Sequence, residues 1–112
     1  MPKNRVLLVE DEPTTRGIVT HLLREAGYAL DAVGSAGAAA TCLETMSYAL
    51  VIVDWFLPDG NGAEIADAAA ERGSKALIIS DMVFQIPSKA AGGHGLLPKP
   101  SPTRHFPIVG RS

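Results

Sequence analysis

The chain is poor in cysteine: Cys42 is the single one among 112 residues. One cysteine excludes an internal disulfide and the paired cysteines of a metal cluster. The chain also has no apolar run long enough to cross a bilayer, and its first residues, MPKNR, lead straight into a predicted strand rather than into the apolar core of a signal peptide. We therefore expect a protein of a reducing compartment, the cytoplasm, with no membrane insertion.

Basic charge is scarce and scattered along the chain. The ten lysines and arginines form no run, and the formal net charge at pH 7 is -2. Proteins that bind nucleic acid directly usually carry a basic stripe, so the charge pattern argues against such a partner. A chain of 112 residues with 46% hydrophobic side chains can fill one core. We expect a single domain over residues 1–112 and no output domain.

Short apolar runs alternate with helical patterns along the chain. Runs of this length that are rich in Val, Ile and Leu are typical of strands buried on both faces of a parallel sheet. The predicted strands are residues 5–9, 28–33, 49–53, 75–80 and 95–98. The predicted helices run from Pro13 to a stop at Gly27, over 35–47 and over 63–71. In the second helix, we expect Ala39, Leu43 and Met46 to face inward.

The alternation of strands and helices predicts the fold class. It is typical of an α/β protein with a flavodoxin-like, doubly wound, five-stranded parallel sheet of order 2-1-3-4-5. Pro98 cannot donate a hydrogen bond to a neighbouring strand, which suits an edge position for the fifth strand. A proline and a glycine pair within 81–94 allow only a short fourth helix, and the prolines of 101–112 predict a truncated or irregular fifth helix.

Polar side chains stand at the ends of four predicted strands. Glu10 and Asp11 follow the first strand, Asp54 follows the third, Ser80 ends the fourth and Lys99 follows the fifth. Ligands bind at the carboxyl ends of the strands in such sheets, so we expect these side chains to meet in one crevice. Three carboxylates, a hydroxyl and an ammonium group together suit a divalent cation and a phosphoryl group.

The charges of this crevice call for a cation. Glu10, Asp11 and Asp54 carry three negative charges against the single positive charge of Lys99, and such a site would repel a phosphoryl group. One Mg²⁺ brings the formal sum to about zero. Mg²⁺ uses one or two carboxylates and keeps several waters, so we expect Asp11 and Asp54 as direct ligands and Glu10 to act through water.

Four motifs, in this order, resemble the receiver domain of two-component response regulators: VLLVEDEP, LVIVDWFLPDGNG, ALIIS and LPKP. The resemblance implies phosphoryl transfer from a histidine kinase or a histidine phosphotransfer protein to Asp54. It also implies that the backbone carbonyl of Phe56 is a metal ligand, that Lys99 binds a phosphoryl oxygen, and that the Ser80 hydroxyl moves toward the new group. It further implies a cis peptide bond between Lys99 and Pro100.

By the same resemblance, the chain is a signalling phosphoacceptor that catalyses only its own phosphorylation and dephosphorylation, and is otherwise no enzyme. It would act through protein contacts on a downstream target. Two departures from the family concern the output rather than the chemistry. Receivers usually have an aromatic residue at the position of Leu96, and a small neutral residue at the position of Asp81. The usual report of phosphorylation is therefore expected to be absent or relocated.

Two alternatives stay open at this point. The chain could be a degenerate receiver that binds its partners without phosphorylation, an idea that Asp81 and Leu96 favour and the complete set of pocket residues opposes. A phosphatase of the haloacid dehalogenase type also uses a strand-end aspartate, a hydroxyl, a lysine and Mg²⁺. It needs a second acid two residues after the nucleophile, and this chain has Phe56 there.

Overall fold

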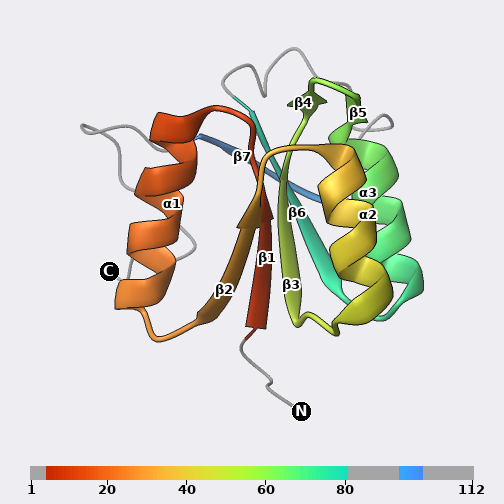
Figure 1. Ribbon diagram of the computed structural model, residues 1–112, viewed down its shortest axis with the longest axis horizontal. Coiled ribbons are helices and arrows are strands. Elements are labelled where there is room, and N and C mark those ends of the chain that lie inside the picture. The colour runs from red at the N-terminus through yellow and green to blue at the C-terminus, as the bar shows by residue number, and fades with distance from the viewer. Residues whose placement is uncertain (1–4, 81–93, 100–112) are drawn as a thin grey trace.

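The computed structural model describes residues 5–80 and 94–99. Five parallel strands form one sheet in the order β2-β1-β3-β6-β7 (Figure 1). Its strands are β1 (Arg5–Val9), β2 (Ala29–Val33), β3 (Leu50–Asp54), β6 (Lys75–Ser80) and β7 (Gly95–Pro98). Three helices are described: α1 (Pro13–Glu25), α2 (Ala36–Thr45) and α3 (Gly62–Glu71). A separate antiparallel hairpin consists of β4 (Phe56–Leu57) and β5 (Gly60–Asn61).

The predicted sheet is confirmed. Because the β4–β5 hairpin stands apart from the main sheet, β6 and β7 are the fourth and fifth strands of the predicted order 2-1-3-4-5. The fold is flavodoxin-like, and within the described residues β7 pairs with β6 alone, as expected for a strand that ends in Pro98. The hairpin was not predicted, since strands of two residues leave no periodic pattern in a sequence.

The sheet is covered on both faces, with α1 on one side and α2 and α3 on the other (Figure 1). Successive residues of β1 point to opposite faces, as a strand requires: Val6 and Leu8 pack with α1, and Leu7 and Val9 pack with α2 and α3. All four are fully buried. The two cores therefore fix the register of the central strand, and with it the position of the loop that follows.

The helices begin and end where the sequence supplies caps. The Glu12 side chain accepts a hydrogen bond from the Thr15 N–H at the start of α1. Ser35 and Asn61 do the same for α2 and α3. Gly27 follows α1 with a φ of 96°, a left-handed conformation that glycine adopts without steric cost.

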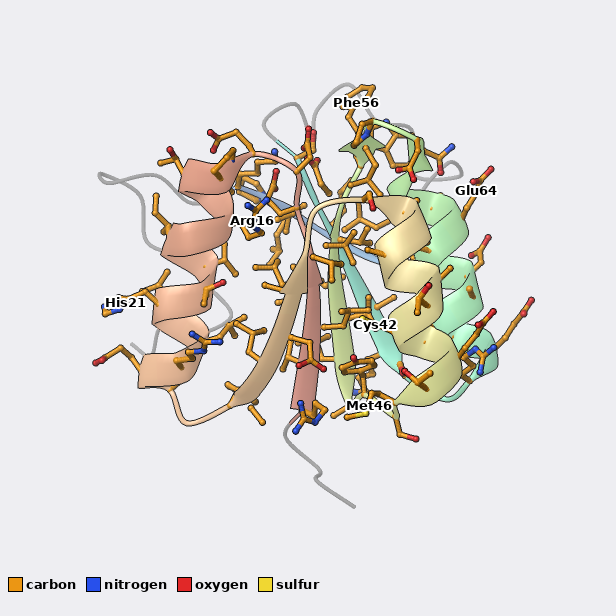
Figure 2. All side chains as sticks on the ribbon, viewed as in Figure 1. Arg16, His21, Cys42, Met46, Phe56 and Glu64 are labelled. Atoms are coloured by element: carbon orange, nitrogen blue, oxygen red, sulfur yellow. The ribbon has the colours of Figure 1, made fainter. Side chains whose placement is uncertain are left out.

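One predicted packing contact is wrong. Met46 is 40% exposed, whereas Ala39 and Leu43 are buried as expected (Figure 2). The reason is that α2 ends at Thr45, and Met46 has extended backbone angles of φ −133° and ψ 152°. An extended residue no longer follows the helical spacing of 3.6 residues, so its side chain leaves the inner face.

Several predictions lie outside the described residues. These are the short fourth helix, the truncated fifth helix, Asp81 and the peptide bond between Lys99 and Pro100. Leu96 is described, and it is partly buried on β7 against the core that α2 and α3 cover.

In the part of the chain that the structure describes, every helix is too short or too polar to span a bilayer.

Candidate functional site

A cavity of about 400 Å³ opens at the carboxyl ends of the sheet strands. Four of the side chains expected to meet there line it, namely Asp11, Asp54, Ser80 and Lys99. The rest of the lining is Glu12, Phe56, Leu57 and Pro58. The structure thus brings together residues from the ends of β1, β3, β6 and β7, as the topology of a parallel sheet predicts.

Three carboxylates stand close enough to share one ion. Oxygen atoms of Glu10, Asp11 and Asp54 all lie within 4.8 Å of one another. Glu10 is fully buried, Asp54 is 3% exposed and Asp11 is exposed to solvent. The Oε1 atom of Glu10 is buried and has no hydrogen-bond partner in the described part of the structure. A buried carboxylate oxygen without a hydrogen-bond partner lowers the stability of the fold. A water molecule bound to Mg²⁺ would satisfy it, so the three carboxylates fit a hydrated Mg²⁺ site.

Lys99 joins two of the three carboxylates. Its Nζ atom lies 2.9 Å from Asp54 Oδ2 and 3.1 Å from Glu10 Oε2. The pairing of β7 with β6 sets this position, since the Lys99 N–H also donates to the Ser80 carbonyl at 3.1 Å. Burial alone would lower the pKa of Lys99, but the hydrogen bonds and charges of Asp54 and Glu10 outweigh it and raise that pKa. The lysine therefore stays positively charged.

The two buried carboxylates are held in an unfavourable environment. Burial raises the pKa of Glu10 to about 7, and the charge of Asp54 adds to this effect. Burial also raises the pKa of Asp54, although Lys99 and the Phe56 N–H act in the opposite direction. Since a single lysine does not offset the cost of burying two carboxylates, a divalent cation would stabilise both in their ionised form.

Asp54 is placed by the end of β3 and by the turn that follows. Its Oδ1 atom accepts a hydrogen bond from the Phe56 N–H at 3.2 Å, and Oδ2 faces Lys99. Ser80, 2% exposed, ends the neighbouring strand β6. Phe56 lines the same cavity from the β4–β5 hairpin, with 61% of its surface exposed (Figure 2).

Sequence reasoning missed Arg16, which braces the loop between β1 and α1. Its guanidinium donates to the Glu10 carbonyl at 2.8 Å and to the Asp11 carbonyl at 3.3 Å. Figure 2 shows Arg16 on the side of α1 that faces the sheet. The signal was available: a cation in the second turn of a helix lies within reach of the acidic loop before that helix. Its charge lies beside the acidic cluster without filling the cavity.

Comparison with known proteins decides the family. A family model described as "Response regulator receiver domain" matches residues 6–106. The chain belongs to this family. Receiver domains belong to two-component signalling systems, and the family acts as signalling phosphoacceptors.

Two curated proteins are similar to this receiver domain in sequence. It is 33% identical to the sensor protein TorS of Escherichia coli in an alignment of 106 positions that covers 88% of this chain and 11% of TorS. It is 26% identical to the transcriptional regulatory protein TorR of the torCAD operon of E. coli, over 94% of this chain and 47% of TorR. The chain thus spans half or less of these relatives.

The structural likeness covers nearly all of both molecules. A response regulator protein of Thermotoga maritima, TrrA, was solved in complex with Mg²⁺-BeF, and it superposes on this receiver domain with a TM-score of 0.72. The two chains are 26% identical, and the match covers 89% of each. The fold predicted from the sequence is therefore that of a known receiver.

Replacing Glu10 by Gln should raise stability and weaken metal binding at once. Ionised Glu10 and Asp54 with Lys99 give the buried group a net charge of -1, and Glu10→Gln makes it neutral. In Mg²⁺-free buffer at pH 8, we expect the free energy of unfolding to rise by about 1 kcal/mol. Mg²⁺ affinity should fall about tenfold. Urea unfolding with and without Mg²⁺ measures both, and Glu71→Gln, at the exposed end of α3, is the control. Loss of stability in Glu10→Gln would contradict this argument.

Proposed function

We propose that this receiver domain accepts a phosphoryl group on Asp54 in a Mg²⁺-dependent reaction. The donor would be a phosphohistidine of a histidine kinase or of a histidine phosphotransfer protein. One observation carries the proposal: the Asp54 carboxylate lies in a cavity at the strand ends, within 4.8 Å of two other carboxylates and 2.9 Å from a lysine ammonium. A nucleophile, a cation site and a fixed positive charge are what phosphoryl transfer requires.

The transfer itself needs little covalent chemistry from the protein. A carboxylate oxygen of Asp54 would form a bond to phosphorus as the bond between phosphorus and the histidine nitrogen breaks. The electron pair of the broken bond returns to the imidazole, which takes up a proton. Asp54 is held for this step by the Phe56 N–H and by Lys99, so its carboxylate has a fixed orientation.

The other pocket residues would act on charge. Glu10 and Asp11, with Asp54 and the Phe56 carbonyl, would hold the cation, Glu10 through water. Bound Mg²⁺ would neutralise the carboxylates and the incoming phosphoryl oxygens. Lys99 would move from its carboxylate partners to a phosphoryl oxygen, and the Ser80 hydroxyl would donate to another. A new acyl phosphate carries roughly 1.5 to 2 negative charges, enough to draw both groups toward it.

The remaining parts of the proposal concern where and how the chain acts. It would work in the cytoplasm, through protein contacts with its kinase and a downstream target, and not as an enzyme on other substrates. The phosphatase alternative needs an acid at position 56, and Phe56 presents an apolar, 61% exposed side chain there. That side chain cannot protonate a leaving group, which opposes the phosphatase alternative.

Intact-mass measurement tests the proposal directly. Incubation of the unmodified chain with Mg²⁺ and acetyl phosphate should add the mass of one phosphoryl group, and chelation of Mg²⁺ should prevent the gain. Trp55 follows Asp54 directly in the sequence, so its fluorescence should change on addition of Mg²⁺ and beryllofluoride. A chain that folds but shows neither response would refute the phosphoacceptor role and support the degenerate receiver.

A further inference from the structure

Asp59 links the wall of the cavity to a helix that does not line it. Its Oδ1 atom accepts a hydrogen bond from the Ala36 N–H at 2.8 Å, and its Oδ2 atom accepts one from the Gly37 N–H at 3.0 Å. Ala36 and Gly37 are the first two residues of α2, and Asp59 lies more than 20 residues further along the chain. One carboxylate thus binds two consecutive amides of a distant helix.

The start of α2 depends on this carboxylate. The first four N–H groups of a helix have no partner within the helix, and a negative charge there is favourable. Ser35 serves two of them, with its side chain accepting from Ala38 and its carbonyl from Ala39. Asp59 serves the other two, and α2 has no acidic residue of its own in its first turn. These backbone hydrogen bonds lower the pKa of Asp59, so it is ionised at neutral pH.

The other end of the link is a hairpin that needs support. β4 and β5 have two residues each, and among residues 5–80 and 94–99 they pair with no other strand. A hairpin of this size is not stable by itself. The base of the hairpin is fixed by the Gly62 N–H, which donates to the Trp55 carbonyl at 2.8 Å. Asp59 is at the turn between β4 and β5, so its bonds to α2 fix the other end. Figure 1 shows β4 and β5 at the same end of the molecule as the start of α2.

Phe56, Leu57 and Pro58, which line the cavity, lie between these two fixed points. We propose that Asp59 is a positioning residue: its bonds to α2 hold this wall in place, so that metal binding and the order of the α2 N-terminus are coupled. The inference rests on the proposed function, because the Phe56 carbonyl is a metal ligand only there. Such coupling is reciprocal: if the bonds to α2 raise the affinity for the cation, bound cation must stabilise the N-terminus of α2 by the same free energy.

The first test compares cation affinities by titration of Trp55 fluorescence with Mg²⁺ alone. We expect Asp59→Ala to weaken binding roughly fivefold or more, and Asp59→Asn, which keeps one acceptor, to lie between that variant and the unmodified chain. Ser35→Ala is the matched comparison, because it removes the local cap of the same helix terminus but keeps the bonds between Asp59 and α2. It should weaken Mg²⁺ binding less than Asp59→Ala does. Glu44→Gln, which removes an exposed acid in the last turn of α2, controls for charge and should bind Mg²⁺ like the unmodified chain.

The second test reads the coupling from the other side. Saturation with Mg²⁺ should slow hydrogen exchange of the Ala36 and Gly37 amides several-fold in the unmodified chain, and should leave it unchanged in Asp59→Ala. A purely structural cap would not make this exchange depend on the cation. Equal affinity of Asp59→Ala and the unmodified chain, or equal weakening by Ser35→Ala, overturns the inference and leaves the proposed function intact. Absence of Mg²⁺ binding by the unmodified chain overturns both.

Discussion

Asp54→Asn is expected to abolish the phosphoryl mass gain that we predict for the unmodified chain with acetyl phosphate and Mg²⁺. The amide has nearly the shape of the carboxylate, so it can keep the hydrogen bond from the Phe56 N–H. It lacks the negative charge and the nucleophilic oxygen, so no acyl phosphate can form at that position. We expect no product within the detection limit of intact-mass measurement, an effect of at least two orders of magnitude.

The control for this result is a carboxylate away from the cavity. Asp67→Asn removes an exposed acid of α3 and should be phosphorylated like the unmodified chain. Thermal unfolding should show that Asp54→Asn is folded and at least as stable as the parent, because it removes a charge that burial disfavours. Full phosphorylation of folded Asp54→Asn would place the acceptor elsewhere, and peptide mapping of that product would locate it.

The sheet could be predicted because its strands are unambiguous. Parallel strands covered on both faces appear as continuous apolar runs, and Val51, Ile52 and Val53 are all fully buried. Four of the pocket side chains were predicted in the same way, since the carboxyl ends of parallel strands lie at one edge of the sheet, where ligands bind. Their convergence is seen in the structure, while their roles in catalysis stay predictions.

The parts that sequence reasoning missed depend on contacts between distant segments. Nothing in the local sequence says that Asp59 caps α2, a helix that begins 23 residues earlier in the chain. The paired contacts of Lys99 were expected to involve a phosphoryl oxygen, and in the structure the lysine instead bridges Glu10 and Asp54. Under the proposed function these would be two states of one site, in which the lysine would leave the carboxylates when a phosphoryl group binds.

Gly62 is the position where the smallest substitution should have the largest effect on folding. A Cβ atom on Gly62 would overlap the Asp54 carbonyl oxygen, and would lie 3.0 Å from the carbonyl carbon and 3.2 Å from the Trp55 Cα. All three are backbone atoms of Asp54 and Trp55, so no side-chain rotation relieves the contact. Gly62 also donates to the Trp55 carbonyl at 2.8 Å, which brings the two segments close. Glycine is needed here for space rather than for an unusual φ.

Gly62→Ala should therefore lower the free energy of unfolding by about 3 kcal/mol or more, because the start of α3 and the end of β3 must separate. The matched control should change the free energy of unfolding in the opposite direction. Gly17 lies exposed within α1, and a Cβ atom added to it would meet nothing within 4 Å, so Gly17→Ala should stabilise the fold by about 0.5–1 kcal/mol. Urea unfolding of both variants measures the pair. Because the strain falls on the Asp54 backbone, any folded Gly62→Ala should also bind Mg²⁺ more weakly than Gly17→Ala. Equal stability of the two variants would show that the loop after Asp54 yields easily, which would also remove the basis for a rigid cavity wall.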